Sequence, residues 1–312
     1  MRPAGVLLLA GVPVLIAATL YGLGPADAEA HGPVLDEITA GPATADGTPS
    51  PSASPSPSAS ASPSPSGSPT LAAATSRPAG LSAPAEKEIA QEIVASAENS
   101  TLNWRSAYAY IEDIGDGQGY TAGLIGFCTG THDLLELVEG YTAQHPDNGL
   151  ARYLPALRRV DGSDSHEGLD PGFTTAWRAE AKVPAFRAAQ DAERDRLYFD
   201  PAVHTAEQDG LGTLGQFIYY DAMVYHGQGT VPNSFGAIRA TALRHARTPA
   251  RGGSERAWLN AFLDARRQAM LSMHPGVDTS RVTAQRGFLD EGNLGLRTPL
   301  TWRMYGETYR IP

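Results

Sequence analysis

The sequence contains a single cysteine, Cys128, among its 312 residues. One cysteine cannot form a disulfide within the chain, so the folded part must be stabilised by its core and not by covalent cross-links. Cys128 lies in the segment Gly126-Phe127-Cys128-Thr129. A buried small hydrophobic side chain is a better interpretation of this cysteine than a catalytic nucleophile.

Basic residues are also scarce, with 24 lysines and arginines against 34 aspartates and glutamates and a net charge of −10 at pH 7. Nucleic acid is therefore not expected as a partner, because phosphate binding requires a basic face. An acidic surface instead attracts and concentrates a cationic polymer. The same charge would also simply keep an exported protein soluble, so this alternative stays open.

Long hydrophobic runs are absent except near the N-terminus, where residues 6–20 follow Arg2. This run is interrupted by Gly11 and Pro13, and it is short for a bilayer span of about 20 residues. Residues 1–30 are therefore predicted to be a secretory signal peptide, with a retained membrane anchor as the alternative. We expect the processed protein to be secreted and extracellular, without membrane association.

Residues 31–80 are dominated by proline, serine and alanine, including the stretch PSASPSPSASASPSPSGSP. Such a composition cannot bury enough apolar surface to offset its ordering entropy. This segment is predicted to be a disordered linker. Residues 81–312 have a globular composition, which suits one domain that can be divided into two lobes.

Hydrophobic periodicity predicts a mainly helical domain of the α+β class. A first amphipathic helix begins at Pro84 and has Glu98 in its last turn. Residues 104–127 alternate in part around a glycine-rich turn at 115–119 and predict a small β-hairpin. The further helical runs are 131–141, 150–160, 173–199, 201–225, 235–247, 254–273 and 279–291.

Two acids stand in different local settings, Glu98 at a helix end and Asp116 in the glycine-rich turn. Glycoside hydrolysis needs one carboxyl group that donates a proton and a second that stays ionised, so this pair favours a glycosidase. A dinucleotide loop is a poorer interpretation because no helix follows the turn. Calcium binding is also weakly supported, because Asp113 and Asp116 lack the ligand spacing of an EF-hand.

Other motifs point away from metals and cofactors. His166-Glu167 lacks the second histidine of a zinc-protease helix and is interpreted as surface polar sequence. No G-x-S-x-G segment is present, which argues against a serine hydrolase of the α/β type. We expect no metal and no cofactor. The tryptophans can stack on sugar rings or fill the core, and the core is the better interpretation for each of Trp104, Trp177, Trp258 and Trp302.

A family resemblance follows from several long segments that occur in order within residues 81–312. They are EIVASAENSTLNW, YIEDIGDGQGYTAGLIGFCTGT, LARYLPAL, ERDRLYFDPAV, LGQFIYYDA, FLDARRQAML and DTSRV. Together they resemble the actinobacterial secreted chitosanases of glycoside hydrolase family 46. This resemblance implies a lysozyme-like, two-lobed fold with a substrate cleft between the lobes. It also implies that 81–312 is a catalytic domain for the inverting endo-hydrolysis of β-1,4 bonds in chitosan, a polymer of glucosamine.

The resemblance also implies roles for particular residues. Glu98 would be the general acid and Asp116 the general base, and Thr121 would help to hold the attacking water. Asp133 would bind a substrate ammonium group. The supporting ion network would consist of Asp221, Arg266 and Arg281. Asp221 lies in the apolar run 217–224, where a buried acid requires a partner.

One position departs from the family pattern, because Gln118 stands where the family often has arginine. We expect this change to alter the mobility of the Asp116 turn or the substrate affinity without abolishing the chemistry. The cleft acids Glu112 and Asp113 are further candidates for binding glucosamine. We expect a monomer. Two alternatives remain, a lysozyme-like or chitinase-like hydrolase of N-acetylated glycans and a non-catalytic polysaccharide-binding module.

Overall fold

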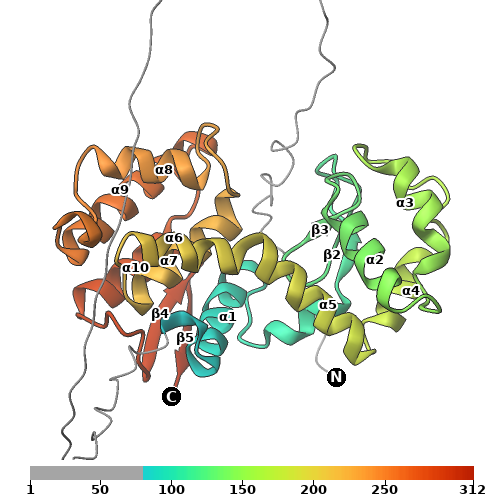
Figure 1. The fold of residues 1–312 in the computed structure, drawn as a ribbon, viewed down its shortest axis with the longest axis horizontal. Helices are drawn as coiled ribbons and strands as arrows, with labels where there is room; N and C mark the ends of the chain where they lie inside the picture. Colours follow the sequence, from blue (N-terminus) through green and yellow to red (C-terminus); the bar gives the residue numbers. More distant parts are fainter. Residues whose placement is uncertain (1–79) are drawn as a thin grey trace, which may run out of the picture. The chain divides into compact units, whose positions relative to one another are not determined.

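The computed structural model describes residues 80–312, and the predicted signal peptide and linker lie outside these residues. The described part is mainly helical with two small antiparallel sheets (Figure 1). This confirms the predicted fold class. The first helices are η1 (Gly80–Ser82), α1 (Pro84–Glu98), η2 (Trp104–Ala109), α2 (Asp133–Gln144), η3 (Ala151–Tyr153), α3 (Leu154–Val160), α4 (Phe173–Glu180) and α5 (Pro184–Arg194). They are followed by η4 (Asp195–Phe199), α6 (Asp200–Gln208), α7 (Thr213–His226), α8 (Phe235–Leu243), η5 (Pro249–Arg251), α9 (Glu255–Met273) and α10 (Ser280–Asp290).

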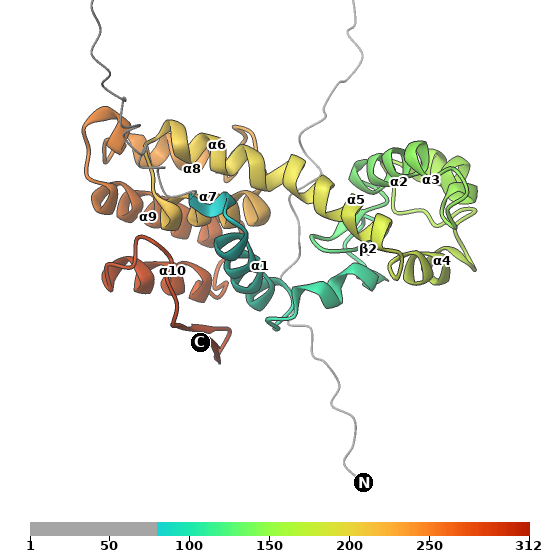
Figure 2. The same ribbon diagram turned by 60° about the horizontal axis from the view of Figure 1, so that its bottom comes forward.

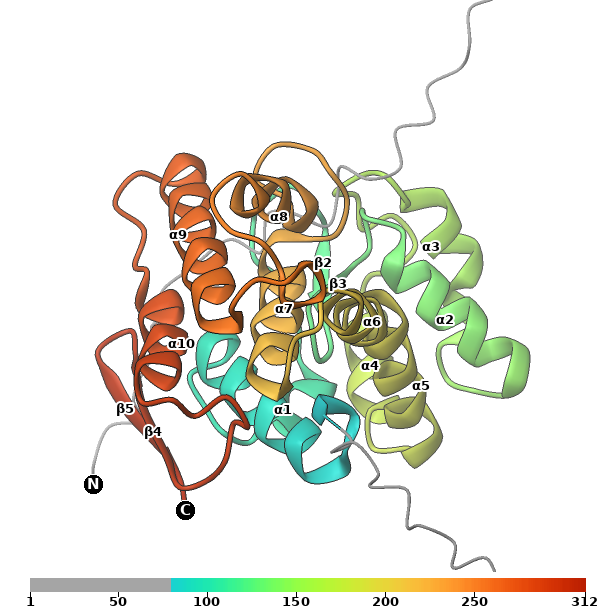
Figure 3. The ribbon, with the colours of Figure 1, turned by 60° about the vertical axis from the view of Figure 1, so that its left-hand side comes forward.

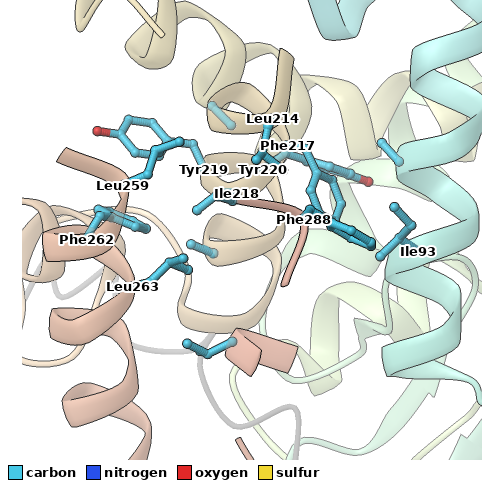
Figure 4. Close-up of a cluster of buried hydrophobic side chains, with 14 of the residues drawn as sticks. Ile93, Leu214, Phe217, Ile218, Tyr219, Tyr220, Leu259, Phe262, Leu263 and Phe288 are labelled. Carbon is cyan, nitrogen blue, oxygen red and sulfur yellow. The ribbon is translucent and has the colours of Figure 1, made fainter. Parts of the chain in front are cut away.

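The largest of three hydrophobic clusters in the described residues surrounds helix α7. Eleven of the side chains of α7 are buried, because its sequence is apolar on nearly every face. Figure 4 shows this helix in contact with α9 through Leu259 and Phe262 and near α1 through Ile93. The central position predicted for this helix is confirmed. Among the described helices, none is long and apolar enough to cross a membrane.

The second cluster combines helices α2, α3, α4 and α5 with the first sheet. At its centre lie Phe127, Phe173, Trp177 and Phe186, each fully buried. Aromatic edges meet aromatic faces here, with Trp177 and Phe186 centroids 5.0 Å apart at 84°. Separate cores of this kind correspond to the two lobes predicted from the sequence.

One continuous helix runs from the second cluster to the first (Figure 2, yellow). Helices α5, η4 and α6 follow one another without a break, and Asp195 and Asp200 keep helical backbone angles at the junctions. The middle segment η4 is a π-helix, a form that is often found at functional sites. Pro201 has no N–H to donate to the carbonyl of Leu197, and the side-chain amide of Gln228 donates to that oxygen.

The first sheet consists of β1 (Ile111–Asp113), β2 (Tyr120–Ala122) and β3 (Phe127–Cys128), in that order and all antiparallel. The hairpin prediction for 104–127 is confirmed at β1 and β2 but is wrong at its start. Residues 104–109 form the 3₁₀-helix η2, in which Trp104 and Tyr108 are buried. The hydrophobic residues of this segment are buried on one side of a helical turn. Over so few residues, their spacing also fits the period of two that is typical of a strand.

The second sheet was not predicted. Strands β4 (Leu300–Met304) and β5 (Glu307–Ile311) form a hairpin beside α10 (Figure 3). Its two-residue turn has positive φ at both Tyr305 and Gly306, which is the usual hairpin turn geometry. On β4, Trp302 donates its indole N–H to the hydroxyl of Ser96 at 3.0 Å. The second sheet therefore supports the end of helix α1.

The single helix predicted for 201–225 is also wrong, because the chain turns between α6 and α7. Gly210 has a φ of 79°, and a Cβ there would lie 2.9 Å from the backbone nitrogen of Ala250. A glycine is needed for both reasons. This turn lets α7 pass back through the first cluster while α6 continues the long helix.

Candidate functional site

Glu98 is the last residue of α1, as predicted. Its Oε1 atom lies 2.6 Å from Nη1 of Arg281, and its side chain is 20% exposed. Two residues earlier, Ser96 donates its hydroxyl to the carbonyl of Ile93 and accepts from Trp302. The helix end is thus fixed both by an ion pair and by the second sheet, so the carboxyl group has a defined direction.

The ion network behind Glu98 is buried. Arg281 lies 2.8 Å from Asp221 Oδ1, and Arg266 lies 2.6 Å from Asp221 Oδ2. Burial opposes ionisation of Asp221, but the two guanidinium groups hold its pKa below the ordinary value. Gln285 donates to Asp221 Oδ2 at 2.6 Å and accepts from Arg266 at 2.9 Å. The predicted network is present, and the resemblance had not indicated Gln285.

The charge of Glu98 acts on three tyrosines, and none was predicted. Burial raises the pKa of Tyr198, Tyr225 and Tyr305, and the negative charge of Glu98 contributes in each case. Tyr225 also lies under the guanidinium of Arg281, 5.1 Å from carbon to ring centroid. Each comes from a different element, η4, α7 and the β4–β5 turn. Their spacing in the sequence therefore gave no signal.

Asp116 lies in the turn between β1 and β2, as predicted. Its Oδ1 atom accepts the backbone N–H of Gln118 at 3.0 Å, which closes the turn locally. No hydrogen-bond partner within residues 80–312 is found for its other oxygen, Oδ2. The carboxylate therefore keeps one oxygen with the capacity to accept a proton.

Thr121 is buried on β2, and its hydroxyl lies 3.4 Å from the sulfur of Cys128 on the paired strand. Burial raises the pKa of Cys128 to about 12, which removes the thiolate that a nucleophile would need. The interpretation of Cys128 as a buried hydrophobic side chain is therefore confirmed.

Asp133 is the first residue of α2 and is 9% exposed. Its Oδ1 atom accepts three hydrogen bonds, from the Thr131 hydroxyl at 2.7 Å and from the backbone N–H groups of Leu134 and Cys128. Burial raises the pKa of Asp133 to about 6, although these hydrogen bonds favour the ionised form. A buried carboxylate with one oxygen fully engaged suits the binding of a single cation.

Two side chains connect the predicted acids electrostatically. The negative charges of Asp133 and Glu98 both contribute to the pKa of Tyr198, and those of Asp133 and Asp116 both contribute to the pKa of Cys128. Asp133 thus shares Tyr198 as an electrostatic neighbour with Glu98, and Cys128 with Asp116. Tyr198 comes from the π-helix η4.

His166 corrects the sequence interpretation. Instead of surface polar sequence, its side chain is only 25% exposed and contacts Tyr120 of β2 and Asp113 of β1. Its partners are distant in the sequence, so no local motif could indicate them. Glu167 beside it remains exposed. The four tryptophans, in contrast, are all buried as predicted, at 9% exposure or less.

No cluster of three or more histidine, cysteine, aspartate or glutamate residues that could hold a metal ion occurs in the described part of the chain. A pocket of about 460 Å³ lies elsewhere, against α4. It is lined by Gly149, Arg152, Pro171, Gly172, Thr175, Ala176, Ala179 and Glu180. None of the predicted site residues contributes to it, so this pocket is separate from the predicted acids.

Comparison with known proteins assigns this site to a family. Residues 92–300 match the model of glycosyl hydrolase family 46. A chitosanase from Streptomyces sp. (strain N174) is 60% identical over 72% of this chain and 82% of its own length, and one from Nocardioides sp. (strain N106) is 53% identical over 72% and 81%. The co-crystal structure of chitosanase OU01 with substrate superposes with a TM-score of 0.71 at 52% identity, covering 75% of this chain and 99% of that one. The chain is an enzyme of the glycoside hydrolase class and belongs to family 46.

Proposed function

We propose that this protein is a secreted, monomeric chitosanase that cleaves internal β-1,4 bonds of chitosan with inversion of configuration. Family membership and two chitosanases at 53% and 60% identity support the substrate. The observation that carries the mechanism is the different setting of the two acids: Arg281 fixes Glu98 at a helix end, and Asp116 in the β1–β2 turn keeps one oxygen without a hydrogen-bond partner among the described residues. Export is proposed from the N-terminal sequence alone.

Glu98 acts as the general acid in this mechanism. It donates a proton to the glycosidic oxygen as the bond to the anomeric carbon breaks. Arg281 fixes the direction of its carboxyl group, and Asp221 in turn holds Arg281 in place. Asp221 offsets one of the two buried guanidinium charges, and Glu98 offsets the other charge when it is ionised.

Asp116 acts as the general base on the opposite face of the sugar. Its Oδ2 atom accepts a proton from the water that attacks the anomeric carbon, while Oδ1 stays bound to the Gln118 backbone. The Thr121 hydroxyl binds the same water in this proposal. Inversion requires carboxyl groups roughly 6.5–9.5 Å apart to leave room for that water. A crystal structure with the two groups about 5 Å apart would instead indicate a retaining enzyme.

Asp133 selects the substrate in this proposal by binding a glucosamine ammonium group. An N-acetylated sugar offers a neutral amide at that position, which would leave the Asp133 carboxylate buried without a counter-charge. The protein is therefore expected to prefer chitosan over chitin and peptidoglycan. Equal turnover of fully acetylated polymer would favour the alternative of a lysozyme-like or chitinase-like hydrolase.

The decisive experiment digests chitosan and follows the anomeric form of fresh reducing ends by NMR. We expect the α-anomer to appear first, because inversion of a β bond produces it. Glu98→Gln and Asp116→Asn should each lower kcat by at least about a hundredfold. Glu92→Gln is a matched control on the same helix and should leave kcat unchanged. Retention of polymer without cleavage by the wild type would indicate a binding module instead.

A further inference from the structure

The turn that carries Asp116 has a defined base. Strand β1 ends at Asp113, β2 begins at Tyr120, and these two residues face each other in the antiparallel register. The intervening residues, 114–119, make no strand pairing of their own. Asp113 and Tyr120 therefore hold the base of the turn, and the Gly130 N–H, which donates to the Gln118 carbonyl at 2.9 Å, holds it further along.

His166 contacts both of these residues from outside the sheet. Its Nε2 atom lies 3.2 Å from Asp113 Oδ2, a close contact outside hydrogen-bond geometry, and its ring stacks on the Tyr120 ring with centroids 4.0 Å apart at 10°. Its Nδ1 atom lies 3.5 Å from Asp170 Oδ2, and Tyr120 donates its hydroxyl to Asp170 Oδ1 at 2.7 Å. Four side chains thus close a ring of contacts at the base of the turn.

This ring continues into the turn itself. The second oxygen of Asp113, Oδ1, accepts the backbone N–H of Gly115 at 2.8 Å. Gly115 directly precedes Asp116 in the sequence. A displacement of Asp113 would consequently move the backbone of the proposed general base.

Backbone from the same loop as His166 also packs against the turn. A Cβ at Gly119, where φ is 71°, would lie 3.6 Å from both the Asp164 Cα and the Ser163 carbonyl oxygen. A Cβ at Gly130 would lie 2.5 Å from that same Ser163 oxygen. The approach of the Ser163 carbonyl requires a glycine at Gly130, whereas at Gly119 a glycine is required by the positive φ and by the Thr129 hydroxyl, with which a Cβ would clash. The loop and the turn therefore behave as one packed unit.

We propose that His166 is a positioning residue that sets the orientation of Asp116 by clamping Asp113 and Tyr120 at the base of the turn. The proposal rests on the proposed role of Asp116 as general base. Misplacement of a catalytic group by about 1 Å can cost as much as a hundredfold in rate. His166 thus acts on kcat through Asp113 and Gly115, without touching the substrate.

The test compares three variants of the full chain on chitosan. His166→Phe keeps a ring against Tyr120 but removes both nitrogen contacts, and Asp113→Ala removes the other partner from an exposed position. Each should lower kcat about tenfold. In His166→Phe, KM should change less than twofold, because His166 is not among the candidate substrate contacts. The KM of Asp113→Ala separately reports whether Asp113 also binds glucosamine. The kcat of the double variant should fall no further than that of either single variant, since both break the same link. His145→Phe, another histidine ring beside a tyrosine, at 5.0 Å from Tyr141, is the matched control and should match the wild type.

Amide hydrogen exchange supplies a readout that does not depend on activity. In His166→Phe, the amides of residues 114–119 should exchange faster, while those of α2 should be unchanged. Unchanged kcat and unchanged exchange in this variant would overturn the proposal, as would a change confined to KM. Full activity of Asp116→Asn would overturn the general-base assignment instead, and the exchange measurement would still report whether His166 holds the turn.

Discussion

The buried carboxyl group of Asp133 predicts that substrate binding depends on pH. Its pKa is raised to about 6, so the carboxylate is present above that pH and is progressively protonated below it. Chitosan amines are protonated under mildly acidic conditions, so both partners carry charge only in an intermediate window. We expect 1/KM for chitosan to follow a bell-shaped pH profile whose acid limb lies near pH 6.

Asp133→Asn should remove that acid limb and raise KM about tenfold at the optimum, because the cation loses its counter-charge. The measurement is KM as a function of pH, with kcat recorded separately. Asp147→Asn, an exposed acid in the same lobe, is the matched control and should keep the limb. An unchanged acid limb in Asp133→Asn would assign it to another group.

At the level of single residues, sequence reasoning identified the acids but not their surroundings. Glu98 and Asp116 could be singled out because a helix end and a glycine-rich turn are local features. Tyr198, Tyr305 and His166 could not, since each reaches the site or its support through contacts between distant segments. The prediction that His166 is exposed was wrong for that reason, because a two-residue motif carries no information about tertiary partners.

The contact between α7, α9 and α10 depends on one carboxylate. Asp221 is 1% exposed and pairs with Arg266 and Arg281, which are equally buried. Asp221→Asn would leave Arg266 in the core without a counter-charge and Arg281 with Glu98 alone, which costs about 3–5 kcal/mol of unfolding free energy. Urea unfolding at pH 7 measures this loss. The exposed pair Asp264–Arg286 is the control, and Asp264→Asn should change stability by less than about 1 kcal/mol.

The same ion network predicts how acid destabilises the protein. Because the folded-state pKa of Asp221 is lowered, its ion pairs stabilise the fold above the ordinary value of 3.8 and are lost as pH falls through the folded pKa. The wild type should therefore lose stability more steeply below pH 3.8 than Asp221→Asn. Urea unfolding between pH 2 and pH 5 checks this, and parallel curves for the two proteins would contradict it.

The sequence predicted helices correctly where only one face of the helix is buried. Helices α9 and α10 lie within a residue of the predicted runs because their apolar positions repeat with the helical period. The β4–β5 hairpin was missed although Leu300, Trp302 and Met304 alternate with exposed residues. A strand of that length offers few repeats, and its turn uses Tyr305 where asparagine or glycine is usual.

At the scale of all described residues, the two large hydrophobic clusters and the continuous helix between them were only partly predictable from the sequence. The sequence predicted two lobes, but it placed a helix interruption at Phe199 and Pro201, where the structure continues through a π-helical segment. Proline normally ends a helix in sequence analysis. Here the amide of Gln228 donates to the Leu197 carbonyl, so a contact from the loop after α7 supports the continuation.

Net charge acts at the scale of the whole protein and leads to a prediction about salt. A charge of −10 at pH 7 creates a field that attracts a cationic polymer before any contact forms. The screening length falls from about 10 Å at 0.1 M to about 3 Å at 1 M ionic strength. We expect kcat/KM on chitosan to fall roughly tenfold over that range, mostly through KM. Urea unfolding at both salt concentrations controls for stability, and a kcat/KM that does not change with salt would show that long-range attraction has no role in substrate capture.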